Sequence, residues 1–224
     1  MRAALEGRAD LAIIEPPGTG ASRPSATFDY SREAFVGWAT DVLEVLGPRV
    51  LVFPCYLGFV AQWTAHTRPE LVTALALSQT PCWSDMAVWL DRVDSKGVLR
   101  LPIVGQVATR ARRSQLVQGW YRASAGNNTQ AKRLSKHAHT CLDEGGAFCL
   151  ASLVQGFFHA GPPPRVSHPV WLAWGDADRT HRRSDPNQSV PGCTVTRFGH
   201  TGHSSELEDP EAFVTALLAF LETR

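Results

Sequence analysis

The sequence of 224 residues predicts an α/β fold, with a mostly parallel sheet flanked by helices and one helical insertion. Short apolar runs alternate with longer amphipathic stretches, which is the pattern of parallel strands joined by helical crossovers. About 90 residues separate the third apolar run from the fourth, far more than a crossover connection requires. We therefore expect one domain whose sheet is interrupted by a cap.

The strands of the sheet are predicted from apolar runs bounded by turn residues. They are Leu11 to Ile14, Val50 to Phe53, Val72 to Leu77, Val170 to Trp174 and Cys193 to Phe198. Between the first two runs, Arg32 to Leu46 carries apolar side chains at helical spacing and stops at Gly47-Pro48. This segment is predicted to be a helix, as is Pro210 to Leu221 near the end of the chain.

The insertion is predicted to be a helical cap over residues 83–165, between core segments 1–82 and 166–224 of one catalytic domain. Apolar spacing predicts its helices, which are Asp85 to Val93, Gln106 to Ala123, Gln130 to Asp143 and Ala147 to Phe158. The run Gly161-Pro162-Pro163-Pro164 returns the chain to the sheet, because consecutive prolines cannot continue a helix.

Composition excludes several classes of protein. A formal charge of +1 and the lack of a basic stripe with interleaved aromatic residues argue against nucleic-acid binding. Five cysteines, an odd number without a C-x-x-C pair, argue against a disulfide framework and a metal site. We expect reduced thiols in a cytoplasmic protein. No apolar run is long enough for a membrane span, and Gly18 and Gly20 lack the rest of a phosphate-binding loop, so neither a membrane nor a cofactor is expected.

Three polar residues, Cys55, Asp178 and His203, stand where chemistry is expected, each soon after a predicted strand. Acyl transfer needs a nucleophile, a base that takes its proton and a carboxylate that orients the base. The helix dipole and a nearby imidazole would favour the thiolate of Cys55, although a small buried core residue is the alternative. His200 is the rival base and Asp176 the rival acid.

The order nucleophile, acid, histidine is that of the α/β-hydrolase superfamily. The chain resembles that family in three further segments. The family's D-x-P-G-x-G-x-S turn is similar to Glu15-Pro16-Pro17-Gly18-Thr19-Gly20-Ala21-Ser22, and its G-x-x-D turn is similar to Gly175-Asp176-Ala177-Asp178. The family's histidine segment is similar to Gly202-His203 and the helix that follows. The resemblance implies an esterase-like or thioesterase-like fold in which cysteine holds the nucleophile position.

The resemblance assigns Cys55 as nucleophile, His203 as base, Asp178 as the acid and the backbone N–H of Tyr56 as an oxyanion donor. The turn around Cys55 differs from the family's G-x-S-x-G motif, because bulky Phe53 and Leu57 occupy the positions of the two glycines. We therefore expect a relaxed or reshaped turn. Gly58 and Ala61 would then allow the helix and the strand to approach closely one turn later. The family's first strands and their His-Gly turn, a second oxyanion donor, are missing, so the fold is expected to be N-terminally shortened.

These observations favour an enzyme that cleaves an ester or thioester of an apolar acyl group, free or bound to a carrier. Aromatic residues of the cap are expected to line the acyl pocket: Trp83, Trp89, Trp120 and Phe158. Two alternatives stay open. One is a non-hydrolytic acyltransferase or an acyl-eliminating lyase acting on a natural-product intermediate, and the other is a non-catalytic binding relative.

Overall fold

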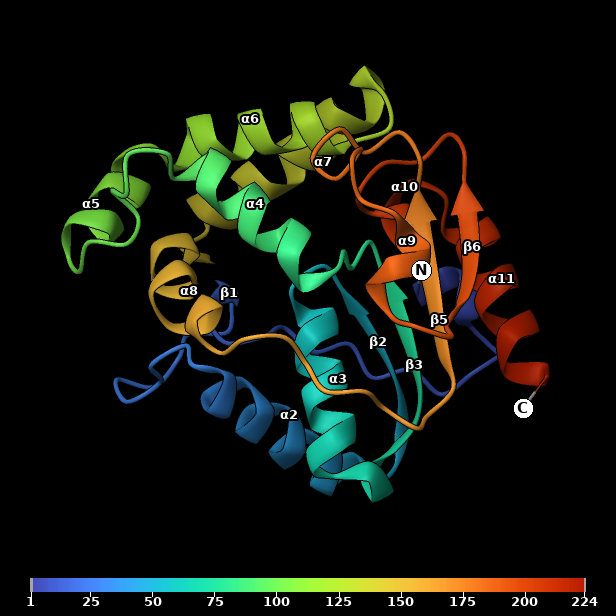
Figure 1. Cartoon of the computed structure of the whole chain (residues 1–224). Coiled ribbons are helices and arrows are strands. Elements are labelled where there is room, and N and C mark those ends of the chain that lie inside the picture. Colours follow the sequence, from blue (N-terminus) through green and yellow to red (C-terminus); the bar gives the residue numbers. More distant parts are fainter. Residues whose placement is uncertain (1, 224) are drawn as a thin grey trace.

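The computed structural model describes residues 2–223 and contains a four-stranded parallel sheet in the order β2-β3-β5-β6 (Figure 1). Its strands are β2 (Arg49–Pro54), β3 (Val72–Ser78), β5 (Val170–Gly175) and β6 (Thr194–Phe198). A second, antiparallel pair joins the two-residue strands β1 (Thr19–Gly20) and β4 (Ala147–Phe148). The predicted α/β class and four of the predicted strands are confirmed.

Alternating side chains of the strands form two cores. Leu75 and Leu77 of β3 face helices α2 (Arg32–Leu46) and α3 (Leu57–Thr67), whereas Ala74 and Ala76 face the other layer. That layer contains α1 (Arg2–Leu5) and α11 (Pro210–Glu222). The helix predicted from Arg32 begins where Ser31 accepts from the N–H of Ala34, and it ends at Gly47.

The strand predicted at Leu11 to Ile14 is wrong, because this segment has no regular secondary structure. Its composition suits a strand, but β2 pairs with β3 alone among the described residues and forms an edge of the sheet. Leu11 still packs against the core, whereas Ile13 is 62% exposed. Strand propensity is expressed only where a neighbouring strand supplies hydrogen-bond partners.

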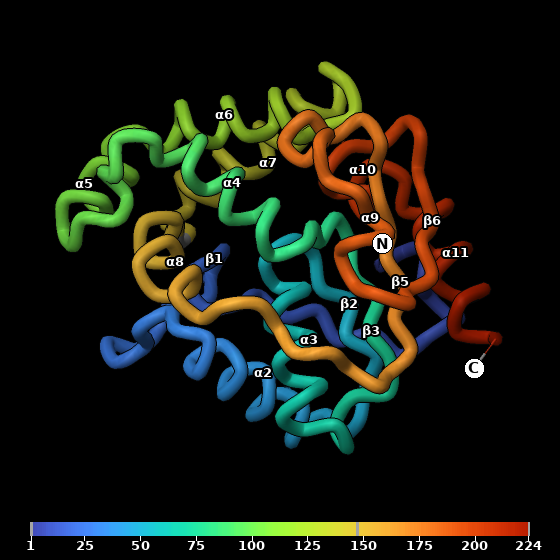
Figure 2. Tube along the Cα trace, viewed as in Figure 1, coloured from blue at the N-terminus to red at the C-terminus, as the bar shows by residue number. Residues whose placement is uncertain are grey.

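The chain between β3 and β5 forms a group of helices near the carboxyl ends of the strands (Figures 1 and 2). They are α4 (Trp83–Val93), α5 (Val104–Ala111), α6 (Arg113–Ser124), α7 (Asn128–Asp143) and α8 (Leu150–Gly156), followed by a 3-10 turn at Phe157–His159. The single helix predicted from Gln106 to Ala123 is wrong, because it divides at Arg112. Its first part packs on α8 and its second on α7, which requires a change of direction.

Three short helical segments complete the chain, a 3-10 turn at Pro69–Leu71, α9 (Pro186–Ser189) and α10 (Ser205–Glu208). The turn that resembles the family's D-x-P-G-x-G-x-S segment is closed by Glu15, whose Oε2 accepts from the N–H of Ala21 at 2.8 Å. Within residues 2–223, no helix combines the length and the apolar character that crossing a bilayer needs.

Candidate active site

Cys55 lies in a sharp turn between β2 and α3. Its φ of 52° places it in the left-handed region, which is costly for a residue with a side chain. The turn is held by three hydrogen bonds: Cys55 N–H donates to Ser78 O at 2.8 Å, and Cys55 O accepts from Gly58 N–H and from Thr80 Oγ1, each at 3.0 Å. The strained turn places Cys55 at the carboxyl end of β2, directly before α3.

The turn around Cys55 is therefore sharp and not relaxed, despite the bulky residues beside it. Phe53 stacks on Trp38 at a ring distance of 6.2 Å, and Leu57, the first residue of α3, is buried in a hydrophobic cluster. Close approach is provided by Gly58, where a Cβ would collide with Thr80 Oγ1. The expectation that Gly58 supplies closeness one turn later agrees with this contact.

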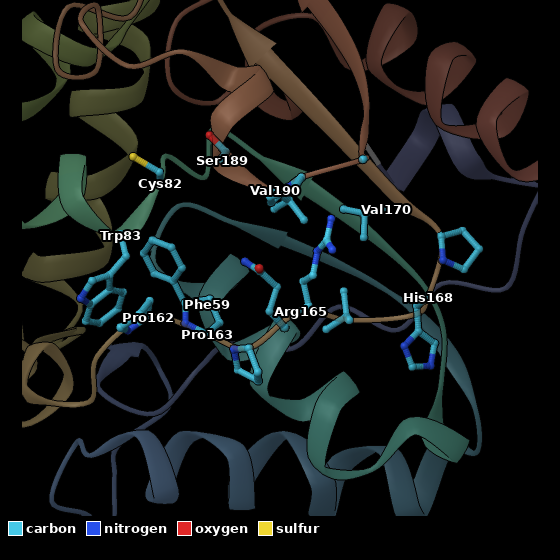
Figure 3. A pocket seen from close by; sticks show the side chains of 16 residues that line it. Phe59, Cys82, Trp83, Pro162, Pro163, Arg165, His168, Val170, Ser189 and Val190 are labelled. Carbon is cyan, nitrogen blue, oxygen red and sulfur yellow. The ribbon is translucent and has the colours of Figure 1, made fainter.

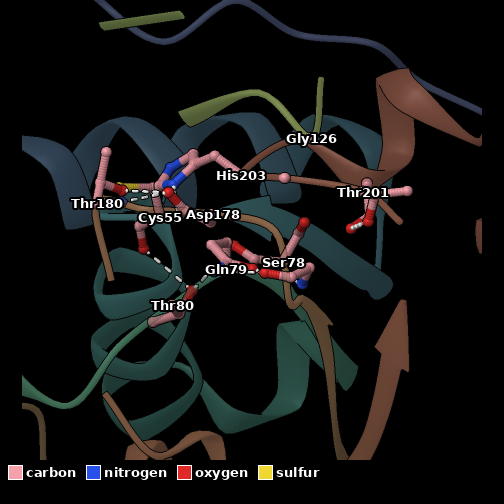
Figure 4. A network of polar contacts seen from close by, with 12 residues as sticks. Cys55, Ser78, Gln79, Thr80, Gly126, Asp178, Thr180, Thr201 and His203 are labelled. Carbon is pink, nitrogen blue, oxygen red and sulfur yellow. Dashed lines mark hydrogen bonds and ion pairs between the residues drawn. The ribbon is translucent and has the colours of Figure 1, made fainter. Parts of the chain in front are cut away.

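Asp178 and His203 form a buried acid–base pair beside Cys55 (Figure 4). Nδ1 of His203 lies 2.8 Å from Oδ2 of Asp178, and the side chains are 7% and 0% exposed. The other carboxylate oxygen accepts from Thr180 N–H at 2.8 Å and from Thr180 Oγ1 at 2.6 Å. Because the carboxylate fixes the proton on Nδ1, Nε2 of His203 is left to accept a proton.

The rival residues lie in other environments. His200 is 72% exposed at its side chain and bonds Asp209 at 2.8 Å, near the start of α11. Asp176 forms an ion pair with Arg197 at 2.6 Å on the surface. Neither belongs to the hydrogen-bond network around Cys55, so the geometry groups Cys55 with Asp178 and His203.

The loop that carries His203 is held by α6, one of the helices between β3 and β5. The N–H of His203 donates to the carbonyl of Ser124 at 2.7 Å, and the ring of Trp120 meets the imidazole edge-on at 4.9 Å. Ala177 N–H bonds Thr201 O at 3.0 Å and ties the loop to the one that carries Asp178. Helix α6 and the loop after β5 thus position the histidine together.

Gly202 permits this close approach, since a Cβ there would collide with the carbonyl of Ser124. We expect Gly202→Ala to lower the free energy of unfolding by about 1–3 kcal/mol, the usual cost of overpacking, and to displace His203. Urea unfolding and Cys55 alkylation rates measure both effects. Gly199→Ala is the matched control, because nothing lies within 4 Å of a Cβ at Gly199. Equal stabilities of the two variants would contradict the packing argument.

The two reactive groups shift each other's pKa. Burial would raise the pKa of the Cys55 thiol, but the imidazoles of His203 and His181 outweigh it and hold the pKa at about 6. Burial would lower the pKa of His203, yet the thiolate and Asp178 raise it to about 10. A thiolate–imidazolium pair is thus the expected resting state at neutral pH.

Sequence comparison alone finds no matching family model and no curated relative. Solved structures do match. A hydrolase from Oleispira antarctica matches with a TM-score of 0.72 at 15% identity, covering 100% of this chain and 85% of its own. NosK from Streptomyces actuosus matches with a TM-score of 0.62 at 22% identity, covering 99% and 89%. An esterase from Exiguobacterium antarcticum matches with a TM-score of 0.64 at 15% identity, covering 93% and 80%.

The chain has the α/β-hydrolase fold. The predicted resemblance is confirmed at the level of the fold, which is what similarity at these identities establishes. In the α/β-hydrolase fold of this chain, the polar residues reach one edge of the sheet from three separate strand ends, those of β2, β5 and β6. Sites of open α/β sheets form at this edge.

The start of α3 offers a place for a developing negative charge. The backbone N–H of Tyr56 precedes the helix and donates to no acceptor in the described part of the chain. Tyr56 follows Cys55 directly, and the dipole of α3 favours negative charge near the start of this helix. The N–H next to Cys55 is therefore unpaired among the described residues, and its role as an oxyanion donor stays a prediction.

The aromatic residues expected to line a pocket fall into two groups. Trp120 lies against His203, and Trp89 meets Trp120 at 5.8 Å, so these two cover the acid–base pair. Trp83 and Phe158 contact each other at 6.1 Å within a cluster of buried aromatic rings above α3. Trp120 and Trp89 thus cover His203, whereas Trp83 and Phe158 belong to the aromatic cluster against which Cys55 also packs.

Trp83 also lines a cavity of about 430 Å³ on the α3 side of the sheet (Figure 3). The cavity extends past Phe59, along the prolines that return the chain from the cap, and toward Val190. Its lining does not include Cys55 or His203.

Sequence reasoning missed His181, which lies three residues after Asp178 and is 3% exposed. Its imidazole stacks on that of His203 with ring centroids 5.5 Å apart. Asp178, His181 and His203 offer ligand atoms within 4.8 Å of one another, as a metal site would. However, both oxygens of Asp178 are already bonded, to Thr180 and to His203. The spacing Asp-x-x-His on one loop was the available signal.

Proposed function

We propose that this protein hydrolyses an ester or thioester of an apolar acyl group through a triad of Cys55, His203 and Asp178. The observation that carries the proposal is the left-handed Cys55 at the end of β2, beside a histidine whose Nδ1 is fixed by a buried carboxylate. That arrangement lifts a thiolate to the edge of the sheet and orients its base.

In the first half of the reaction, the Cys55 thiolate attacks the carbonyl carbon and a C–S bond forms. The N–H of Tyr56 stabilises the oxyanion while His203 gives its Nε2 proton to the leaving alcohol or thiol. In the second half, His203 takes a proton from water, whose oxygen attacks the thioester carbon. The acid is released, and the sulfur departs as a thiolate beside the new imidazolium.

The apolar character of the acyl group follows from the surroundings of the pair. Trp120 covers His203, and Trp89 packs against Trp120, so a substrate beside the thiol meets aromatic surface. Such surface favours hydrocarbon over sugar or charged groups. We expect kcat/KM to rise with acyl chain length over short p-nitrophenyl esters and acyl thioesters.

The test is turnover of such esters and thioesters, with the products identified by mass spectrometry. Hydrolysis gives one free acid for each alcohol or thiol released. An acyl group found on an added thiol or amine would support transfer instead, and an alkene product would support elimination. Absence of any product across the series would contradict catalysis and favour a binding protein.

The lowered pKa of Cys55 predicts selective labelling. Above pH 6 the thiolate predominates, so iodoacetamide at pH 7 should modify Cys55 first. Burial raises the pKa of Cys149 to about 11 and also raises that of Cys193, which keeps both protonated. Peptide mapping by mass spectrometry measures the order. Modification of Cys149 or Cys193 ahead of Cys55 would show that no activated thiolate is present.

A further inference from the structure

His181 lies directly against the reacting groups but belongs to none of the roles described above. It sits on the loop after β5 and is buried to 97%, with its ring inclined by 30° to that of His203. Trp89 of α4 also contacts it, with the ring centroids 6.4 Å apart. Two imidazoles are therefore stacked beside one thiol, between a cap helix and the edge of the sheet.

The ring of His181 has a hydrogen-bonding atom without a partner. Its Nε2 is buried and makes no hydrogen bond to any described residue. Leaving a buried polar atom unpaired is unfavourable, so such an atom in a native structure calls for an explanation. The ring also helps to lower the pKa of the Cys55 thiol, and it stacks on His203, the other imidazole that does so.

We propose that His181 is a second catalytic imidazole, which donates an N–H to the sulfur of Cys55 whenever the sulfur is a thiolate. The inference rests on the proposed function and deepens it. In the resting enzyme, His181 and His203 share the charge of the thiolate. In deacylation, water attacks the acyl carbon and gives its proton to His203. The C–S bond then breaks, its electron pair goes to sulfur, and the N–H of His181 meets the new charge.

Two other charged residues, Asp178 and Arg92, lie near His181 and have hydrogen-bond partners of their own. Asp178 is engaged by Thr180 and His203, so it does not hold the second ring. From α4, Arg92 donates to the carbonyl of Thr180 at 3.1 Å and adds a positive charge beside the loop. Of the two imidazoles that lower the pKa of the Cys55 thiol, only His203 is hydrogen-bonded to a carboxylate.

The experiment measures the alkylation rate of Cys55 against pH in the variant His181→Phe. The phenyl ring of this variant keeps the stacking on His203 but has no N–H to donate. We expect the midpoint to rise by about one pH unit or more from its wild-type value near 6. His181→Gln, which restores an N–H donor, should return the midpoint toward the wild-type value. His200→Phe, the matched change at an exposed histidine, should leave it unchanged.

A wild-type midpoint in His181→Phe would overturn the inference while leaving the triad intact. A wild-type protein that itself titrates near the ordinary value of about 8.5 would overturn the triad as well. His181→Leu is measured beside His181→Phe, so that a folding defect in one removal variant does not decide the result. Rescue by glutamine separates donation of an N–H from mere packing, which phenylalanine preserves better.

Discussion

Cys55→Ala should lose turnover of acyl esters and thioesters by a factor on the order of 10⁶, because removal of the nucleophile removes the covalent route. Steady-state rates on the best substrate of the series measure the loss. Cys193→Ala is the matched control, since that thiol lies at the far end of β6 and takes no part in the site. The control should retain wild-type rates.

Cys55→Ser should retain part of the activity, because His203 can still take a proton from a hydroxyl. The serine variant should also lose activity below neutral pH, since an alcohol needs a neutral base whereas the thiolate of Cys55 persists down to about pH 6. Equal rates in the wild-type, alanine and serine proteins would exclude covalent catalysis at this position.

Asp178→Asn should lower kcat by a factor on the order of 10⁴, because an amide in place of the carboxylate no longer fixes the proton on Nδ1 of His203. The loss of negative charge should also lower the pKa of His203, which the carboxylate helps to raise to about 10. The alkaline limit of activity should then move toward neutral pH. Steady-state rates measured across the pH range give both the loss of kcat and the shift of the alkaline limit.

Asp176→Asn is the control for that substitution, because it makes the same change two residues earlier. It breaks the surface ion pair with Arg197, which contributes little to stability. We expect it to keep wild-type kcat and an unchanged pH profile. A loss at Asp176 equal to that at Asp178 would contradict the assignment of the acid.

The sequence predicts those parts of the fold that depend on local pattern. The apolar runs that became the central strands β3 and β5 are buried, and those that became the edge strands β2 and β6 are partly buried. The helix from Arg32 has its own N-cap and ends at a glycine. The run from Leu11 failed because a strand needs a partner from elsewhere in the chain. The pairing of β1 with β4 was not foreseen for the same reason.

In the site, too, features set by local sequence could be predicted, whereas features set by contacts between distant segments could not. Cys55, Asp178 and His203 could be proposed because each follows a predicted strand, and parallel strands end at one edge of the sheet. The stacking of His181 on His203 and the contact of Ser124 with His203 depend on how loops and cap fold over that edge. The Asp-x-x-His spacing could point to His181, but it does not predict its stacking on His203. The sharp turn at Cys55 was also unforeseen, because the large residues beside it pack away from that turn.

The most direct test of the account is a search for the acyl-enzyme. The protein is mixed with a p-nitrophenyl ester, quenched in acid within the first turnovers and weighed intact by mass spectrometry. We expect one added acyl group, which peptide mapping places on Cys55 and which is absent from Cys55→Ala. In Cys55→Ser the same group should appear as an oxygen ester. Turnover without any acylated protein, or an acyl group mapped to another residue, would contradict covalent catalysis by Cys55.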